Sequence, residues 1–192
     1  MIRELSTCLL FLASITSSSA SAQVSCQPTT SGVIACPCGN NPSGSGGCNN
    51  SLNTGGAVLT ATGSPSLSAD NIQFNCTGIG SATFSCSGSN TSLLSLLFEG
   101  SNPIANGVVW GDGVLCCSGP FYMLNAQVSS AGVYHWPVPG TTGVSLQALA
   151  LGDPLVVGST RFYFVAYRDN CPSFCPSSVR QKSNSWTLTW TP

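Results

Sequence analysis

Short runs in which apolar and polar residues alternate recur along the chain from residue 57 onward, and Gly, Asn, Ser and Pro separate them. Alternation with a period of two predicts a β-strand with one buried face, and clusters of turn formers mark the ends of such strands. By periodicity alone, LLSLLF and VSLQALAL could each form a helical turn instead. Nine segments are predicted to be strands: 57–62, 72–76, 82–86, 92–100, 107–117, 121–128, 144–151, 160–169 and 186–192.

Two of these segments indicate how the sheets are covered. In SWTLTWT, Trp186, Leu188 and Trp190 share one face and threonines occupy the other, so the tryptophans are predicted to lie in the core. The segment TRFYFVAYRD is apolar on both faces, which predicts a central strand covered above and below. Many short strands without a long helical period predict an all-β fold, an antiparallel β-sandwich that is jelly-roll-like.

The composition limits the kind of partner. With 192 residues, 42% of them hydrophobic, the chain is long enough for one domain with a sizeable core. Only 6% of the residues are charged and the formal net charge is −1, so no basic stripe can follow a phosphate backbone and no nucleic-acid partner is expected. Solubility must come from hydroxyl and amide groups, which is typical of exported, β-rich bacterial proteins.

The N-terminus has the pattern of a secretory signal. Arg3 supplies a positive charge, CLLFLASIT at 8–16 supplies a short apolar run, and A-S-A at 20–22 supplies the small residues that a signal peptidase needs. We expect cleavage before Gln23, and neither this run nor any later one is long enough to span a bilayer.

These features predict an organisation and a location. The expected parts are a signal peptide at 1–22, a segment rich in Cys, Gly, Ser and Asn at 23–56, and a β-sandwich domain at 57–192. The expected location is bacterial and outside the cytoplasm, either secreted, at the cell surface or in the periplasm, with no membrane span after signal cleavage.

The stretch CPCGNNPSGSGGC from Cys36 to Cys48 could be a metal site, a redox centre or a set of cross-links. Zinc would need paired C-x-x-C spacings or nearby histidines, and His135 is the only histidine in the chain. A redox thiolate would need an exposed position at a helix N-terminus, which Pro, Gly and Asn cannot build. Removal of the signal leaves ten cysteines, so we expect five disulfides and no cofactor.

Spacing leaves several pairings open. Cys36 and Cys38 are too close to bridge each other comfortably, so each is expected to pair with Cys26 or Cys48.

The remaining cysteines lie in the expected β-domain. Cys76 and Cys86 end two strand-like runs separated by a turn, which predicts a bridge across a hairpin. Cys116 and Cys117 would point to opposite faces of a strand. Two long-range links are expected among these regions and the C-terminal loop that holds Cys171 and Cys175.

Several motifs occur together in a recognisable order: CPCGNN with a following GC, GAVLTATGSPSLSADN, WGDGVLC, YRD followed by FC, and WTLTWTP. In this order the chain from Cys36 to Pro192 resembles an uncharacterised family of exported bacterial proteins. In that family a CPCGN…GC segment leads into a β-domain with FGDG-x-x-C, W/Y-Y-R, FC and a terminal V-x-W-x-P.

The resemblance implies an exported sandwich and no particular activity. It implies that Cys116 pairs with Cys175, because these two match the cysteines of the family's β-domain. Trp110 replaces the Phe of FGDG. The four other cysteines look like additions and fit two more bridges, Cys76–Cys86 and Cys117–Cys171.

Few side chains could carry catalysis. A Ser-His-Asp site would have to use His135, but no G-x-S-x-G motif accompanies it. Glu99 and Asp112 could form the acid pair of a glycosidase. Asp112, between two glycines, could bind Ca²⁺, but the D-x-D-x-D pattern is absent, and a tight turn in which Asp112 caps backbone N–H groups is the favoured interpretation.

Aromatic residues offer the other candidate site. Tyr134 and Trp136 are expected in a loop, where they could stack on sugars, although a place in the core is favoured for Trp136. We therefore expect a structural or adhesive protein without catalysis, with a glycan or an envelope or extracellular protein as its partner. The alternatives are a carbohydrate-binding module that uses Tyr134, Trp136 and Trp110, and an extracellular hydrolase.

Overall fold

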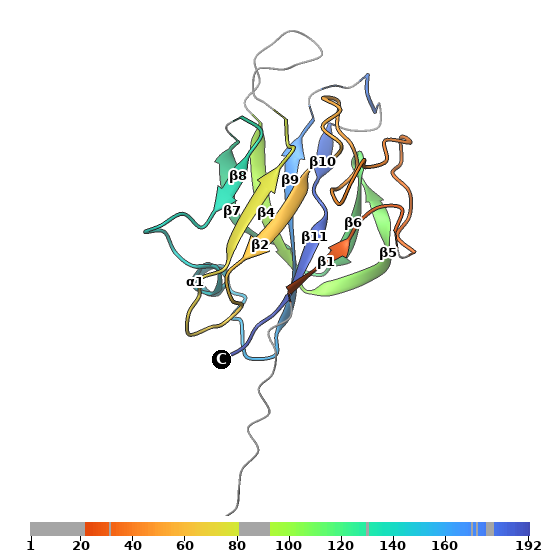
Figure 1. The fold of residues 1–192 in the computed structure, drawn as a ribbon. Coiled ribbons are helices and arrows are strands. Elements are labelled where there is room, and N and C mark those ends of the chain that lie inside the picture. The colour runs from red at the N-terminus through yellow and green to blue at the C-terminus, as the bar shows by residue number, and fades with distance from the viewer. Residues whose placement is uncertain are drawn as a thin grey trace, which may run out of the picture.

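The computed structural model describes residues 22–30, 32–80, 93–129, 131–169, 171, 173–175 and 179–192. Within them the chain forms one short helix, α1 (Val144–Ala150), and a series of antiparallel strands (Figure 1). The strands are β1 (Ala22–Cys26), β2 (Val58–Thr62), β3 (Gln73–Thr77), β4 (Leu94–Gly100), β5 (Asn102–Trp110), β6 (Gly113–Ser118), β7 (Tyr122–Val128), β8 (Tyr134–Trp136), β9 (Thr160–Arg168), β10 (Arg180–Lys182) and β11 (Ser185–Thr189).

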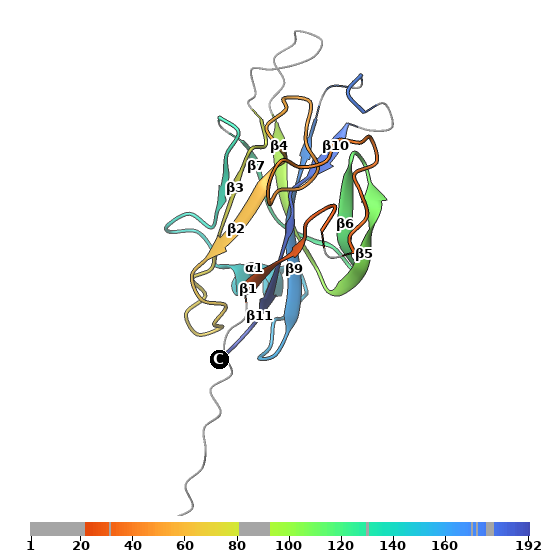
Figure 2. The same ribbon diagram turned by 45° about the vertical axis from the view of Figure 1, so that its right-hand side comes forward.

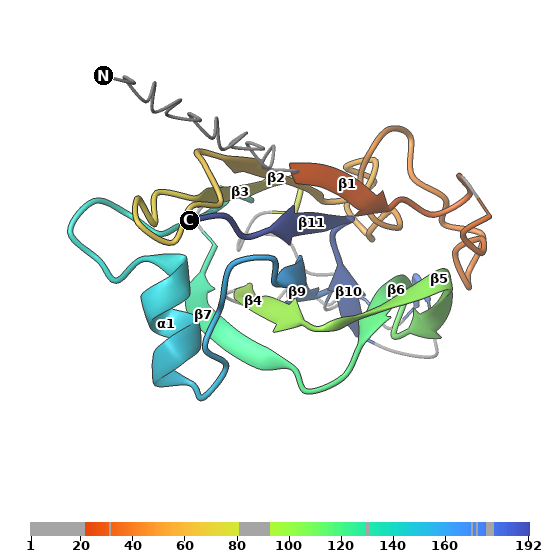
Figure 3. The ribbon, with the colours of Figure 1, turned by 90° about the horizontal axis from the view of Figure 1, so that it is seen from below.

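The strands make two stacked sheets and a separate hairpin. Six strands form one sheet in the order β1-β11-β9-β4-β7, with β10 paired to β9 beside β11. A three-stranded sheet, β2-β3-β8, lies against it, and β5 pairs only with β6. Figure 3 shows β2 and β3 in a layer above β4 and β9, and Figure 2 shows the β5–β6 hairpin set to one side of the larger sheet.

The main core fills the space between the two sheets. Leu97 of β4 lies opposite Val165 of β9 in the ladder, and both are fully buried beneath Leu59 and Phe74 of the smaller sheet. The rings of Phe74 and Tyr163 lie 4.8 Å apart across this interface. Side chains that alternate along β4 and β9 therefore supply one buried face of a sandwich.

A second core lies on the opposite face of the same sheet. Phe162, Phe164 and Ala166 of β9 pack there against Leu115 and Cys117 of the hairpin. The expectation that TRFYFVAYRD forms a central strand covered on both faces is confirmed. The core position of Trp190 is confirmed as well, whereas Trp186 is only partly buried and packs against the edge of the core. The all-β, antiparallel fold class is confirmed as well.

Two segments that were predicted to be single strands have a different secondary structure. The segment 107–117 is not one strand, because the chain reverses at Gly111 (φ +61°), and the two halves pair with each other as β5 and β6. This reversal is the predicted tight turn. A side chain at Gly111 would collide with the Arg180 carbonyl oxygen, which accepts the Asp112 N–H at 2.8 Å.

The segment 144–151 forms helix α1 and not a strand. Asp70 fixes the start of the helix, because its carboxylate accepts the N–H groups of Ser145 (3.0 Å) and Leu146 (3.3 Å). Val144 and Ala148, four residues apart, bury the inner side of the helix. No described helix has the length and apolar character needed to cross a membrane.

Three strands, β1, β8 and β10, were not predicted, because each is short and lacks a clear alternation. The predicted strand at 82–86 lies outside the described residues.

Candidate functional site

Three disulfides join described cysteines, and two of them span long stretches of sequence. Cys26 pairs with Cys116 and Cys38 pairs with Cys175, at sequence separations of 90 and 137 residues. Cys36 pairs with Cys48, which was one of the predicted alternatives. The corresponding Cα atoms lie 5.6, 5.8 and 5.8 Å apart, within the usual range for a disulfide.

Two predicted pairings of these cysteines are wrong. Cys116 does not pair with Cys175, as the family resemblance implied, because β6 places Cys116 beside Cys26 at the end of β1, in a cluster with Val114. Cys38 pairs with neither Cys26 nor Cys48. It pairs instead with Cys175 in the C-terminal loop, so the N-terminal segment is covalently tied both to β6 and to the C-terminal loop.

The remaining predicted bridges are also wrong, because Cys76 and Cys117 are free, buried thiols. Cys76 points into the core between the two sheets, so it cannot form the predicted bridge to Cys86, which lies outside the described residues. Cys117 faces the second core and Cys171 is disulfide-bonded elsewhere, so Cys117–Cys171 does not form. The six-stranded sheet separates the two free thiols, and Cys116 and Cys117 do point to opposite faces, as expected.

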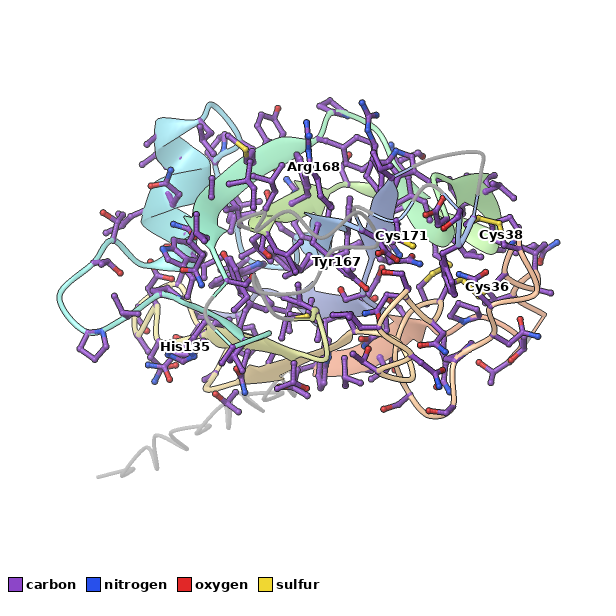
Figure 4. The ribbon with its side chains drawn as sticks, turned by 90° about the horizontal axis from the view of Figure 1, so that it is seen from above. Cys36, Cys38, His135, Tyr167, Arg168 and Cys171 are labelled. Atoms are coloured by element: carbon purple, nitrogen blue, oxygen red, sulfur yellow. A yellow bond between two sulfur atoms is a disulfide. The ribbon has the colours of Figure 1, made fainter. Side chains whose placement is uncertain are left out.

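Side-chain amides fix the cysteine-rich segment to the hairpin and to β10. Nδ2 of Asn40 donates to the carbonyl oxygens of Asn49 (2.7 Å) and Asp112 (3.1 Å). Nε2 of Gln181 donates to the same two oxygens at 3.0 and 3.3 Å. Figure 4 shows Cys36 and Cys38 in this segment at the hairpin side of the molecule.

The same segment is also bonded to the end of β9. Asn50 Nδ2 donates to the hydroxyl of the buried Tyr167 at 3.2 Å, and the Ser51 N–H donates to Asp169 at 2.7 Å. Disulfides and hydrogen bonds together therefore hold this segment against the domain. The cysteines of the segment are all used in these disulfides.

Asp112 does not gather ligands for a cation. Its side chain is buried, and its Oδ1 has no hydrogen-bond partner among the described residues, so the expected capping of N–H groups is not observed. Burial, together with the nearby Asp169 carboxyl, raises the pKa of Asp112 to about 7. No three His, Cys, Asp or Glu side chains in the described ranges could hold a metal ion together. The calcium alternative therefore has no support from these residues.

Glu99 belongs to a different cluster from Asp112. Glu99 lies opposite Tyr163 near the start of β9, whereas Asp112 bonds to Arg180, whose strand partner is Arg168 at the end of β9. Five residues of strand separate these two positions, about 17 Å. Glu99 and Asp112, which the sequence offered only as a possible acid pair of a hydrolase, are therefore too far apart to act together.

The neighbours of Glu99 are Arg161 and Asp153. Arg161 donates two hydrogen bonds of 2.8 Å to Asp153, and its Nε lies 3.7 Å from Glu99. Burial, together with the adjacent Asp153 carboxyl, raises the pKa of Glu99 to about 8, although Arg161 acts in the opposite direction. The Arg161 guanidinium lowers the pKa of Asp153. The cluster is a structural Arg161–Asp153 ion pair beside a buried acid whose pKa is raised.

Tyr134 and Trp136 lie in the core and not in an exposed loop. They belong to β8, which pairs with β3, and only His135 between them is half-exposed. The Tyr134 hydroxyl donates to Asn125 Oδ1 at 3.0 Å. The His135 ring makes no hydrogen bond to a described residue. These two aromatic side chains are therefore unavailable for sugar stacking, and the core position favoured for Trp136 is confirmed.

Trp110 is the one predicted aromatic residue that borders an open site. It ends β5 and leans over the outer face of the six-stranded sheet, where its ring meets that of Phe164 edge-on at a centroid distance of 6.4 Å. The hairpin covers only part of this face. Beside Trp110 the face is hollowed into a groove of about 310 Å³.

The groove is built from strands that are apolar on both faces. Leu94, Leu96 and Phe98 of β4 and Ala166 of β9 form its floor, and Phe98 stacks on Phe164 at 5.5 Å. Leu94 in the floor is 42% exposed, and Met123 (46%) and Val128 (57%) extend the apolar surface beyond the groove. An exposed apolar groove of this kind is a candidate binding surface.

One end of the groove is positively charged. Arg168 and Arg180 line it, and they face each other as cross-strand partners on β9 and β10. Figure 4 shows Arg168 on the side of β9 that faces away from the smaller sheet, opposite to Tyr167. Lys182, two residues along β10, is buried with its Nζ 5.3 Å from the centre of the Phe164 ring and 2.6 Å from the Val114 carbonyl oxygen.

Except for Trp110, sequence analysis missed this site. The signal it could have used is that LLSLLF is apolar on both faces, like β9, so part of its outer face needs a cover. Comparison with protein-family models, with curated proteins and with solved structures gives no match for this chain.

Proposed function

We propose that this protein is exported and acts outside the cytoplasm as a non-catalytic, disulfide-braced β-sandwich that adheres to its partner through the groove beside Trp110. The observation that carries the proposal is the exposed apolar face of β4 and β7 beside the groove. A rigid sheet that presents apolar side chains loses little conformational entropy on binding, so it is suited to adhesion.

Two features support the location and the absence of catalysis. Long-range disulfides form and persist in oxidising compartments, which agrees with the signal sequence expected at 1–22 and with the resemblance to exported proteins. Glu99 and Asp153 are engaged with Arg161, and the His135 ring has no described partner that could make it a general base.

The carbohydrate-binding alternative is less favoured. A sugar site needs polar groups that pair with hydroxyls as well as an aromatic platform, and the groove floor is built from Leu94, Leu96, Phe98 and Ala166. With Tyr134 and Trp136 in the core, Trp110 would be the only platform left of the three that were predicted.

The test of adhesion uses the oxidised chain from Gln23 to Pro192 on surfaces of defined chemistry. Surface plasmon resonance should show retention on a methyl-terminated monolayer, weak retention on a hydroxyl-terminated one, and no hit on a glycan array. Leu96→Asp should abolish the retention, because it places a carboxylate in the groove. Leu149→Asp, which replaces an exposed leucine on α1, is the matched control and should behave as wild type. Specific glycan binding, or retention that Leu96→Asp leaves unchanged, would overturn the adhesive role.

Export has its own test. Residues 1–22 fused to a reporter that is active only after export should give a positive signal in a bacterial host. Arg3→Glu combined with Leu10→Asp should abolish that signal, since these changes remove the charge and interrupt the apolar run.

A further inference from the structure

Strand β5, the outer strand of the hairpin in Figure 2, contains a long bulge. The ladder between β5 and β6 skips residues 104–107, which together lie opposite the single residue Cys116. The extra residues of a bulge are left out of the ladder that holds paired strands together. Within the bulge Asn106 is exposed and Gly107 is buried, and Asn106 is the only asparagine in the sequence that is followed by glycine.

The fold requires the glycine of this pair. Gly107 has a φ of +71°, in the left-handed region that favours glycine. A Cβ atom at Gly107 would lie 2.6 Å from Cγ1 of Val114 and 3.2 Å from Sγ of Cys116, so a side chain has no room there. The side-chain amide of Asn106, in contrast, makes no hydrogen bond to a described residue. The described contacts therefore explain the glycine at 107 and leave the asparagine at 106 without a structural role.

The backbone around this pair favours a reaction between the two residues. The backbone nitrogen of a glycine can attack the side-chain carbonyl carbon of a preceding asparagine, because no Cβ atom obstructs the succinimide ring that forms. The attacking nitrogen must first lose its proton, and the negative charge then spreads onto the carbonyl oxygen of the same peptide group, here that of Asn106. The Ile34 N–H donates to this oxygen at 2.9 Å, so it stabilises the charge as the donors of an oxyanion hole do.

Other described asparagines lack this combination of features. Asn50 and Asn184 precede serines, but both are buried and their amide groups are hydrogen-bonded. Asn53 and Asn75 are exposed, but each is followed by a residue that has a side chain. Exposure and a following glycine therefore coincide at Asn106 alone.

We propose that Asn106–Gly107 is a site of spontaneous deamidation, which converts Asn106 into a mixture of aspartate and isoaspartate. The Gly107 nitrogen bonds to Cγ of Asn106, the Cγ–Nδ2 bond breaks, and ammonia leaves with the proton from Gly107. Water then opens the succinimide. Opening at Cγ gives aspartate, and opening at the backbone carbonyl gives isoaspartate, in which the main chain runs through the side chain. Water is the only co-reactant, no group is oxidised or reduced, and the product carries one added negative charge.

Isoaspartate at this position loosens the cover over a disulfide. The Cys26–Cys116 disulfide is buried, and Gly107 packs against its Cys116 side. Isoaspartate inserts a methylene group into the backbone and converts the carbonyl that accepts the Ile34 N–H into a free carboxylate. The bulge then cannot keep its present path over Cys116, so the disulfide becomes accessible to thiols.

Ageing of the oxidised chain from Gln23 to Pro192, followed by peptide mapping, tests the site. Electron-transfer fragmentation distinguishes isoaspartate from aspartate, and both should accumulate at Asn106 while Asn53 and Asn75 stay unmodified. Formation should be about tenfold faster at pH 9 than at pH 8, because the attacking nitrogen must be deprotonated. Asn106→Gln, which keeps a side-chain amide but needs a larger ring for the same attack, is the matched control and should stay unmodified.

The same ageing in guanidinium chloride shows how the unfolded chain reacts. Conversion of Asn106 in both the native and the unfolded chain is the expected result. Conversion in the unfolded chain with Asn106 intact in the native chain would show that the fold protects this pair, and the proposal would be overturned. Equal conversion at Asn75 in the native chain would also contradict it, because the reaction would then not depend on the bulge or on Gly107.

Loss of cover over the disulfide has a separate readout. Native protein is treated with a mild thiol, and the cysteines released are alkylated and located by mass spectrometry. Aged wild type should lose the Cys26–Cys116 disulfide several-fold faster than fresh wild type, and aged Asn106→Gln should match the fresh protein. Asn106→Asp carries the added charge without the extra methylene group, so it should also match fresh wild type. Equal reduction of Cys26–Cys116 in aged and fresh wild type would show that isoaspartate leaves the disulfide covered.

Discussion

The side-chain amide of Asn184 pairs with the backbone of Leu59 in the way that a neighbouring strand would. The Leu59 N–H donates to Oδ1 of Asn184 at 2.6 Å, and Nδ2 of Asn184 donates to the Leu59 carbonyl oxygen at 3.0 Å. Asn184 interrupts the run of β10 into β11, and Leu59 lies on β2 of the other sheet. One buried amide therefore joins the two sheets along one side of the sandwich.

The opposite side of the sandwich is joined in a similar manner. In the orientation that satisfies both partners, the Gln127 amide of β7 donates to the His135 carbonyl oxygen (3.3 Å) and accepts from the His135 N–H (3.1 Å). An amide side chain thus bridges β7 of the larger sheet to β8 of the smaller one. Backbone groups at two sheet edges are satisfied without a further strand.

Asn184→Ala should destabilise the protein by about 2 to 4 kcal/mol, because the buried Leu59 N–H loses its acceptor and the carbonyl oxygen loses one of its donors. Asn184→Asp should be comparably damaging, since it places a second oxygen against the Leu59 carbonyl. Urea unfolding of the oxidised chain measures the change. Asn75→Ala, at an exposed position of β3, is the matched control and should lie within about 0.5 kcal/mol of wild type.

Gly47 of the cysteine-rich loop lies directly against the backbone of β10. A side chain at Gly47 would run into the carbonyl oxygen of Lys182, and the loop approaches that backbone closely because Cys48 is tethered to Cys36. Gly47→Ala should therefore cost about 1 to 3 kcal/mol, since backbone atoms must move apart. Gly44→Ala, in the same loop with no atom within 4 Å of its added methyl group, is the control and should be nearly neutral in the same urea assay.

Sequence analysis found the strands in which apolar and polar residues alternate because one face of the strand is buried. β2, β4, β7 and β9 fall within predicted segments, and β3 and β11 each extend one residue beyond theirs. The apolar residues on both faces of β9 correctly predicted its central position. β8 was not predicted, because a three-residue strand next to Pro137 is too short to show an alternation of apolar and polar residues.

Features that depend on distant residues could not be found in this way. Val144–Ala150 is as apolar as a strand, and it becomes a helix where Asp70, 75 residues before Ser145, accepts its first N–H groups. The Cys38–Cys175 bridge likewise depends on how β10 and the N-terminal segment fold together. The groove exists because the hairpin covers only part of the sheet, and local sequence does not encode that coverage.

Cys76 and Cys117 should not react with thiol reagents in the native protein. Burial raises the pKa of the Cys117 thiol to about 11 and raises that of Cys76 further, so little thiolate forms at neutral pH and solvent does not reach it. Iodoacetamide at pH 8 followed by mass spectrometry should show both residues unmodified in the native chain and alkylated after unfolding in urea without reductant. Alkylation of either residue in the native state would contradict its burial.

The Cys38–Cys175 disulfide should contribute more stability than Cys36–Cys48. Cross-linking residues 137 apart removes more entropy from the unfolded chain than cross-linking residues 12 apart, about 5 against about 3 kcal/mol in the chain-entropy picture. Double serine variants of each pair, compared by urea unfolding, measure the two losses. Because the other cross-links remain in each variant, the order of the two losses is the quantity to compare. A larger loss for the Cys36–Cys48 variant would show that native contacts, and not loop length, determine the contribution.

Glu99 should make the protein less stable as the pH rises from about 5 to about 8. The pKa of Glu99 is near 8 in the folded state but close to 4.5 in the unfolded chain, so between these values the folded state holds a proton that the unfolded state has released. Stability therefore falls with pH in this window, by at most about 1.4 kcal/mol per pH unit. Glu99→Gln removes this dependence and leaves those of Asp112 and Lys182 in place. Urea unfolding of both proteins from pH 5 to pH 8 should show wild type losing stability relative to Glu99→Gln as the pH rises. A constant difference would mean that Arg161, whose Nε is 3.7 Å away, keeps Glu99 ionised throughout.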